Sequence, residues 1–179
     1  DSVRRFLETE AMPQHEQWEK DGMVSDDIWL KAGEQGFLCP MVPEKYGGVS
    51  TDFRYNCIVN EEIARAGCTR LGWTLHNDIS VPYIVRYGSD YQKEKYLPRC
   101  VSGELITAIA MTEPGAGSDI QGTKTTAVLD GDHYILNGSK TFITNGQKAG
   151  LVIVVAKTDT TAGSKGISLF LVEADFPGF

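Results

Sequence analysis

The spacing of apolar residues changes near residue 104, and this change constrains the fold more than any other feature of the sequence. Before that point, apolar side chains recur every three or four residues, which is the period of an amphipathic helix. After it they come in short runs or alternate with polar residues, as they do in strands. The sequence therefore predicts an α+β multidomain chain, with an all-α domain over residues 1–104 and an all-β domain, an antiparallel sandwich or barrel, over residues 105–179.

Capping residues and prolines mark helix ends and breaks in the first half. Asp52 precedes an amphipathic run and is suited to cap a helix, and Ser89 with Gln92 three residues later predicts a capping box. Pro13 and Pro82 each interrupt a helical pattern. Because proline removes a backbone hydrogen bond and crowds the preceding turn, we expect a kink or break at both positions.

Turn signals separate the strand-like runs of the second half. The Asp-Gly pair at 130–131 is typical of a two-residue hairpin turn. Residues 139–144 lie between two Asn-Gly pairs and are predicted to form a strand bounded by turns. Alternation along that strand would put Phe142 and Thr144 on one face and Ile143 on the other. Turn signals every eight to twelve residues favour antiparallel pairing over βαβ units.

Composition and charge exclude several classes of protein. The 17 Lys and Arg residues against 24 Asp and Glu give a net charge of −7, and no basic cluster is present, which argues against nucleic-acid binding. The longest apolar run, residues 151–156, is far shorter than the ~20 residues that a membrane span needs. The four cysteines and three histidines lack zinc-site spacing, so we expect free thiols in a reducing compartment and no metal site.

Two segments have the composition of a ligand site. The first, A-M-T-E-P-G-A-G-S-D at 110–119, contains glycines that would let backbone N–H groups approach a ligand. It lacks the third glycine and the following helix of a dinucleotide-binding fingerprint. The second, N-G-S-K-T-F-I-T-N-G at 137–146, would put an aromatic ring beside a hydroxyl, which suits a flat heterocycle. From these residues alone, the first segment could equally be a plain connection between strands, and Phe142 of the second could equally be a core residue.

The two segments together resemble a known family. M-T-E-P-G-A-G-S-D at 111–119 followed by F-I-T-N-G at 142–146 closely resembles the acyl-CoA dehydrogenases, flavoproteins of fatty-acid and branched-chain acyl-CoA oxidation. The resemblance extends over nearly the whole chain through P-E-K-Y-G-G at 43–48 and G-I-S-L-F-L-V at 166–172. The sequence I-A-M-T-E-P-G-A-G-S-D-I-Q-G at 109–122 is most similar to that of long-chain members. The resemblance implies FAD, held between the middle domain and a C-terminal four-helix bundle that this chain does not contain.

The resemblance also implies site residues. Thr112 would bind the pyrimidine edge of the flavin, Phe142 would pack on the isoalloxazine ring, and Thr144 would hydrogen-bond near N5. Ser118 would contact both FAD and the acyl-CoA thioester. The expected FAD-binding residues are Ile109, Met111, Thr112, Gly117, Ser118, Phe142, Ile143 (through its backbone) and Thr144.

No catalytic residue is assigned within the chain. The base of the family is a glutamate of the C-terminal bundle, which would lie beyond Phe179, whereas Glu113 and Asp119 are expected to shape a turn. The chain begins with Asp1 and ends directly after a strand-like run, so we expect it to be a piece of a longer polypeptide. As an isolated piece, it is expected to be inactive and to hold FAD poorly.

The activity that the resemblance implies is α,β-dehydrogenation of an acyl-CoA to a trans-2-enoyl-CoA, with hydride transfer to FAD. The expected electron acceptor is an electron-transfer flavoprotein, the expected assembly a homotetramer, and the expected location the bacterial cytoplasm or the mitochondrial matrix. One alternative is an acyl-CoA oxidase or related flavin oxidase or monooxygenase of the same fold. Another is a non-catalytic or DNA-binding relative, against which the net charge counts.

Overall fold

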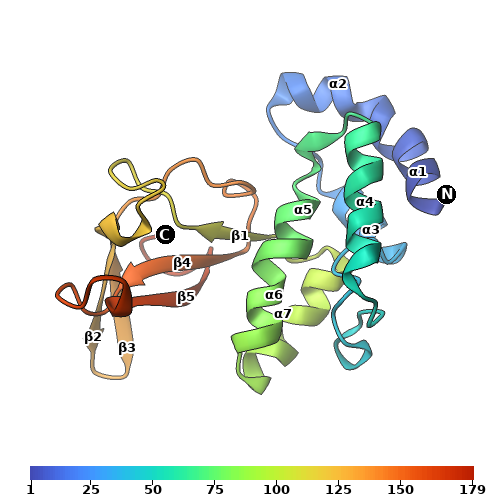
Figure 1. Cartoon of the computed structure of the whole chain (residues 1–179). Helices are drawn as coiled ribbons and strands as arrows, with labels where there is room; N and C mark the ends of the chain where they lie inside the picture. Colours follow the sequence, from blue (N-terminus) through green and yellow to red (C-terminus); the bar gives the residue numbers. More distant parts are fainter. The chain divides into compact units, whose positions relative to one another are not determined.

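Two compact units, Asp1–Ile106 and Thr107–Phe179, make up the chain (Figure 1). A computed structural model describes all 179 residues. The first unit is helical, and all five strands belong to the second. A helical unit followed by a unit built on a sheet confirms the predicted fold class.

Helices of the first unit are short and joined by tight turns. They are α1 (Ser2–Phe6), η1 (Leu7–Ala11), α2 (Met12–Asp21), α3 (Asp27–Glu34), η2 (Glu44–Tyr46), α4 (Phe53–Arg65), η3 (Thr69–Leu71), α5 (Trp73–Leu75), η4 (His76–Ser80), α6 (Val81–Tyr87) and α7 (Asp90–Ser102).

Both predicted proline breaks are confirmed, and both take the form of a π-helical turn. The π-turn η1 directly precedes α2, whose second residue is Pro13, and the π-turn η4 directly precedes α6, whose second residue is Pro82. Proline has no N–H to donate to the carbonyl four residues earlier and crowds it. A wider π-turn before the ring lets the chain continue in helical form past the proline.

The predicted caps are also confirmed. The Asp52 carboxylate accepts the Arg54 backbone N–H at 2.9 Å at the start of α4. At the start of α7, Ser89 and Gln92 form the complete capping box, with hydrogen bonds of 3.2 and 2.9 Å. These contacts satisfy N–H groups that have no partner within the helix.

The core of the helical unit is built on aromatic side chains. Trp29 and Trp73 are almost wholly buried and meet edge to face, with ring centroids 6.4 Å apart. Phe6 packs against Trp73 and, at 5.3 Å, against Phe37. The rings come from α1, α3, α5 and the segment after α3, so the core joins helices that are distant in sequence.

The second unit is a five-stranded mixed sheet. Its path runs β1-β4-β2-β3, and β5 pairs with β4. β1 pairs with β4 in parallel, and β2 also pairs with β4 in parallel, through a single residue pair. The β2–β3 and β4–β5 pairs are antiparallel. The elements are β1 (Thr107–Ala110), η5 (Ile120–Gly122), β2 (Thr126–Asp130), β3 (His133–Asn137), β4 (Leu151–Lys157), η6 (Gly163–Gly166) and β5 (Ile167–Glu173).

The predicted all-antiparallel pairing was therefore wrong in part. The Asp-Gly turn at 130–131 does form the β2–β3 hairpin, with Gly131 at φ 64°. However, the chain leaves β1, makes that hairpin and returns to β1 as β4, which brings two strands of the same direction together. Turn spacing reports local reversals and not which strands become neighbours.

The strand predicted over residues 139–144 does not form, and the Asn-Gly pair before it does not make a hairpin. Residues 138–150 are an irregular connection from β3 to β4. Phe142 (φ 55°) and Asn145 (φ 64°) both have left-handed backbone, which no strand accepts. The Asn145 side-chain amide donates to the Thr107 carbonyl at 3.2 Å, and two backbone N–H groups return to the Asn145 carbonyl. The alternating pattern of residues 139–144 thus belongs to an irregular turn and not to a paired β-strand.

Candidate functional site

The two motif segments meet at the end of β1. The Thr141 N–H donates to the Thr112 carbonyl at 3.0 Å, and the Lys140 ammonium donates to the Met111 carbonyl at 3.0 Å. These contacts join residues about thirty positions apart in the chain. The structure therefore brings together the two segments that the sequence singled out separately.

The first segment forms a tight turn whose glycines face open space. Glu113 and Ala116 exchange two backbone hydrogen bonds, of 2.9 and 3.1 Å. A Cβ atom built on Gly115 or Gly117 would meet nothing within 4 Å, and neither glycine has a positive φ. Neither backbone strain nor crowding explains these glycines. They leave the main chain uncovered, so that a ligand could approach it closely.

Glu113 is buried at the base of this turn and holds it in shape. Its carboxylate accepts the Lys124 and Thr125 N–H groups at 2.7 and 3.0 Å, the Thr125 hydroxyl, and the Lys140 ammonium at 2.9 Å. Burial by itself would raise the pKa of Glu113, but these hydrogen bonds outweigh it and lower the pKa to about 2. A carboxylate that is already fully engaged is a poor proton acceptor, so Glu113 is structural, as expected.

The lowered pKa of Glu113 predicts a loss of stability in acid. Because the folded protein holds this carboxylate at a pKa of about 2, against 4.5 for an ordinary glutamate, the unfolded chain binds the proton more readily. The contribution is complete above about pH 4.5 and disappears as the pH falls toward 2, a change of up to about 3 kcal/mol. Urea unfolding at stepped pH would measure it. The Glu113→Gln variant should lack this part of the acid slope, and an identical slope in both proteins would contradict the assignment.

The second segment exposes the residues expected to face a cofactor. Phe142 is 93% exposed, although large apolar side chains are normally covered. Thr144 is exposed as well, whereas Ile143 between them is partly buried against the core cluster of Ala108, Ala110, Ala149, Val152 and Val154. Exposure thus alternates along Phe142, Ile143 and Thr144, but the backbone is not the predicted strand.

The remaining predicted residues divide into two groups. Gly117 and Ser118 are exposed on the first segment, and Met111 and Thr112 are partly exposed beside the junction with the second. Ile109 is buried and, by strand alternation, points away from the face on which Ala108, Ala110 and Ile143 pack. The side chain of Ile109 is thus separated from the exposed set.

This arrangement fits a flat heterocyclic cofactor. An uncovered phenylalanine held at an unfavourable φ offers a planar apolar face, and Thr112 and Thr144 offer hydroxyl groups for a polar edge. The open main chain at Gly115 and Gly117 leaves room for close approach. Each of these properties suits a group with flat faces and a hydrogen-bonding rim, such as a flavin.

Lys140 is the residue of this site that the sequence reasoning missed. It stands inside the N-G-S-K-T-F-I-T-N-G segment, in which the aromatic and hydroxyl residues carry the prediction of a ligand site. A lysine between predicted turns is ordinarily a solvated surface residue. Lys140 lies beside Glu113 because segments far apart in the chain pair with one another, and no local sequence pattern predicts that pairing.

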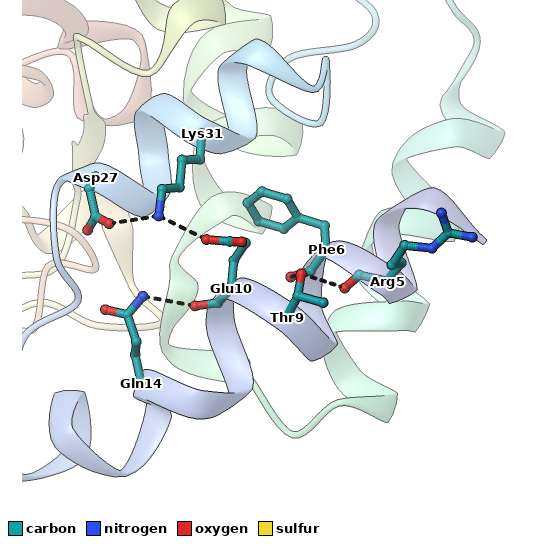
Figure 2. Close-up of polar contacts among 7 residues, drawn as sticks. All are labelled: Arg5, Phe6, Thr9, Glu10, Gln14, Asp27 and Lys31. Atoms are coloured by element: carbon teal, nitrogen blue, oxygen red, sulfur yellow. Dashed lines mark hydrogen bonds and ion pairs between the residues drawn. The ribbon is translucent and has the colours of Figure 1, made fainter.

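Other polar clusters of the molecule are accounted for by packing. A surface hollow between α1, η1 and α3 contains Lys31, but its ammonium is paired with Glu10 at 2.8 Å and Asp27 at 3.3 Å (Figure 2). In the helical core, burial lowers the pKa of His76 to about 4, and the ring bonds to the Cys100 carbonyl.

No set of three or more His, Cys, Asp or Glu side chains is arranged to hold a metal ion. None of the helices combines the length and apolar character needed to cross a membrane.

Comparison with known proteins identifies the family. Residues 1–104 match the acyl-CoA dehydrogenase N-terminal domain, and residues 108–179 match the acyl-CoA dehydrogenase middle domain. The chain belongs to the acyl-CoA dehydrogenase family.

Individual relatives agree with this assignment. Over its whole length the chain is 51% identical to the mitochondrial long-chain specific acyl-CoA dehydrogenase of Rattus norvegicus, of which it covers 42%. It aligns over 99% of its length with the crystal structure of an acyl-CoA dehydrogenase from Geobacillus kaustophilus, at 57% identity and a TM-score of 0.96, covering 47% of that chain. A glutaryl-CoA dehydrogenase from Mycobacterium smegmatis, solved in complex with FADH2, aligns over 99% of the chain at 34% identity and a TM-score of 0.88, with 45% of it covered. The chain thus spans less than half the length of these relatives.

Proposed function

We propose that the full-length protein carrying this chain is a FAD-dependent acyl-CoA dehydrogenase that converts an acyl-CoA thioester into a trans-2-enoyl-CoA. The observation that carries the proposal is the junction of the two motif segments, where Lys140 and Thr141 bond to Met111 and Thr112 beside the uncovered ring of Phe142. Family membership and a relative solved with FADH2 support the choice of cofactor.

The residues of this chain would bind and orient. Phe142 would cover one face of the isoalloxazine ring, the Thr112 hydroxyl would bond to the pyrimidine edge, and Thr144 would bond near N5. The backbone of Ile143 would reach the ring edge, and Met111 and Gly117 would complete the lining on the first segment, whereas the buried side chain of Ile109 would not reach the ring. When bound, FAD supplies the hydride acceptor, while the protein supplies position and electrostatic environment.

Ser118 would contact both the cofactor and the thioester of the substrate. It is exposed on the open turn, next to Gly117. Holding the thioester beside the flavin would bring the β carbon of the acyl chain toward the hydride acceptor and leave the α proton accessible to a base.

The base itself is proposed to be a glutamate outside residues 1–179. Glu113 lies at the junction of the two motif segments, but its low pKa and four hydrogen-bond donors make it unsuitable as the base. We also propose that residues 1–179 alone lack one wall of the flavin site, so activity belongs to the longer protein.

Anaerobic addition of acyl-CoA to the purified, full-length yellow protein tests this function. Bleaching of the flavin absorption is expected, and a series from butyryl-CoA to palmitoyl-CoA would identify the substrate class. The identity to a long-chain relative favours the longer thioesters. Rapid reoxidation in air would favour the oxidase alternative, whereas reoxidation only by an artificial acceptor or electron-transfer flavoprotein supports the dehydrogenase. Colourless protein that does not take up FAD would exclude both.

Assembly and location are part of the same proposal. We infer a homotetramer that passes electrons to an electron-transfer flavoprotein in the bacterial cytoplasm or the mitochondrial matrix. Mitochondrial relatives and bacterial structures both support this range of locations.

Replacing Phe142 by alanine is expected to weaken FAD binding by about 1–3 kcal/mol, or roughly 5- to 150-fold in Kd, which is the value of one aromatic stacking contact. The free energy of unfolding of the flavin-free protein should hardly change, because the side chain is almost fully exposed. Titration of the flavin-free protein with FAD measures the effect. Phe176→Ala, which removes another exposed phenylalanine of the same unit, is the matched control, and equal FAD affinity in the two variants would contradict the proposed role.

A further inference from the structure

The ammonium group of Lys140 lies at the junction of the two motif segments. It donates to the Glu113 carboxylate at 2.9 Å and to the Met111 carbonyl at 3.0 Å. The Lys140 side chain is only 11% exposed and that of Glu113 only 5%. A charge withdrawn from water to this extent persists only where protein acceptors replace the lost hydration. Both acceptors belong to the start of the 111–119 turn, so Lys140 ties its own segment to that turn.

Directly after Lys140 the backbone enters an unfavourable conformation. The Thr141 N–H is bonded to Thr112, and Phe142 follows at φ 55°, where a bulky residue is strained. Such a conformation persists only when its surroundings fix it from both sides. After Phe142, the packing of Ile143 on the sheet and the bond from Asn145 to Thr107 provide one anchor. Before Phe142, Lys140 and Thr141 provide the other.

We propose that Lys140 is a positioning residue, which fixes the left-handed backbone at Phe142 and so the orientation of the aromatic face that receives the flavin. This inference rests on the proposed FAD site and assigns a function to a residue outside the predicted set. Its two contacts have separable roles: the Glu113 carboxylate neutralises the buried charge, and the Met111 carbonyl transmits position.

A purely electrostatic role is the competing explanation. If Lys140 serves only to neutralise Glu113, then removing both charges together restores everything that removing one of them disturbs. If the bond to Met111 sets the position of the segment, removing both charges restores stability but not flavin binding. A double variant therefore separates the two explanations.

The experiment uses the full-length protein and three variants: Lys140→Met, the double variant Glu113→Gln/Lys140→Met, and Lys165→Met as the matched control at an exposed lysine. Three quantities are compared: the unfolding midpoint, the Kd for FAD of the flavin-free protein, and deuterium uptake by peptides covering residues 140–144 without flavin. Lys140→Met should lower the midpoint, weaken FAD binding about 10- to 100-fold, the range for one hydrogen bond to a charged group, and speed exchange at the Thr141 amide. The control should leave all three unchanged.

The double variant decides between the explanations. Recovery of the unfolding midpoint together with persistently weak FAD binding and fast exchange at residues 140–144 supports positioning, and it does so even if Lys140→Met alone fails to fold. Recovery of FAD affinity along with stability would overturn the proposal in favour of charge neutralisation. Wild-type FAD affinity in Lys140→Met would overturn it as well. If the wild-type protein itself does not bind FAD, the proposed function fails first and this inference fails with it.

Discussion

Replacing Glu113 by alanine is expected to destabilise the protein by about 3–5 kcal/mol, the cost of removing one partner of a buried ion pair. The substitution leaves the largely buried Lys140 ammonium with the Met111 carbonyl as its acceptor, and it leaves the Lys124 and Thr125 N–H groups without their acceptor. Each unpaired group adds a desolvation cost. Urea or guanidinium unfolding of the full-length protein, followed by circular dichroism, would measure the change.

The matched control for this prediction is Asp175→Ala. Asp175 is an exposed carboxylate of the same unit, and removal of a solvated charge should change the free energy of unfolding by no more than about 0.5 kcal/mol. Equal effects of the two substitutions would mean that the turn at 113–116 does not depend on the buried carboxylate.

Replacing Trp73 by alanine is expected to cost about 3–5 kcal/mol, because truncation of a buried aromatic ring leaves a cavity that the core fills only in part. Trp73 has no exposed surface and packs against the rings of Phe6 and Trp29. Its loss should therefore weaken contacts between α1, α3 and α5. The same unfolding measurement applies, and Tyr91→Ala, at a largely exposed aromatic residue, serves as the control.

A second substitution at this position sharpens the test. The indole N–H of Trp73 is buried without a hydrogen-bond partner, which is itself unfavourable. Trp73→Phe removes this N–H together with part of the ring, so the lost packing is partly offset and the cost should be well below that of Trp73→Ala. A cost for Trp73→Phe as large as that for Trp73→Ala would show that the indole group makes a contribution beyond packing.

The junction at Lys140 shows how the site and the fold depend on one another. The Lys140 ammonium that ties residues 138–150 to the Met111 carbonyl is also a hydrogen-bond donor to the buried Glu113 carboxylate. Local sequence rules fail here, since a segment with strand-like composition adopts left-handed backbone at Phe142 and Asn145. Departures of this kind are expected at functional sites, where surrounding structure supports a conformation that the local sequence alone would not choose.

Local physical chemistry determined much of the protein from its sequence. Asp52, Ser89 and Gln92 cap helices because a side-chain oxygen next to a free N–H stabilises any helix start, whatever lies around it. Pro13 and Pro82 interrupt helices for an equally local reason. The change in apolar spacing near residue 104 and the two motif sequences can likewise be recognised without tertiary information. The first predicts the fold class, and the second indicate the family.

Only the tertiary structure decided how distant segments pair. The return of β4 alongside β1 makes the sheet mixed, and that pairing brings residues 138–150 against the turn at 111–119. Lys140 becomes buried, Glu113 gains its fourth donor, and Phe142 turns outward as a consequence. Each of these outcomes depends on contacts between residues far apart in the chain, where burial and hydrogen bonding outweigh the preferences of neighbouring residues.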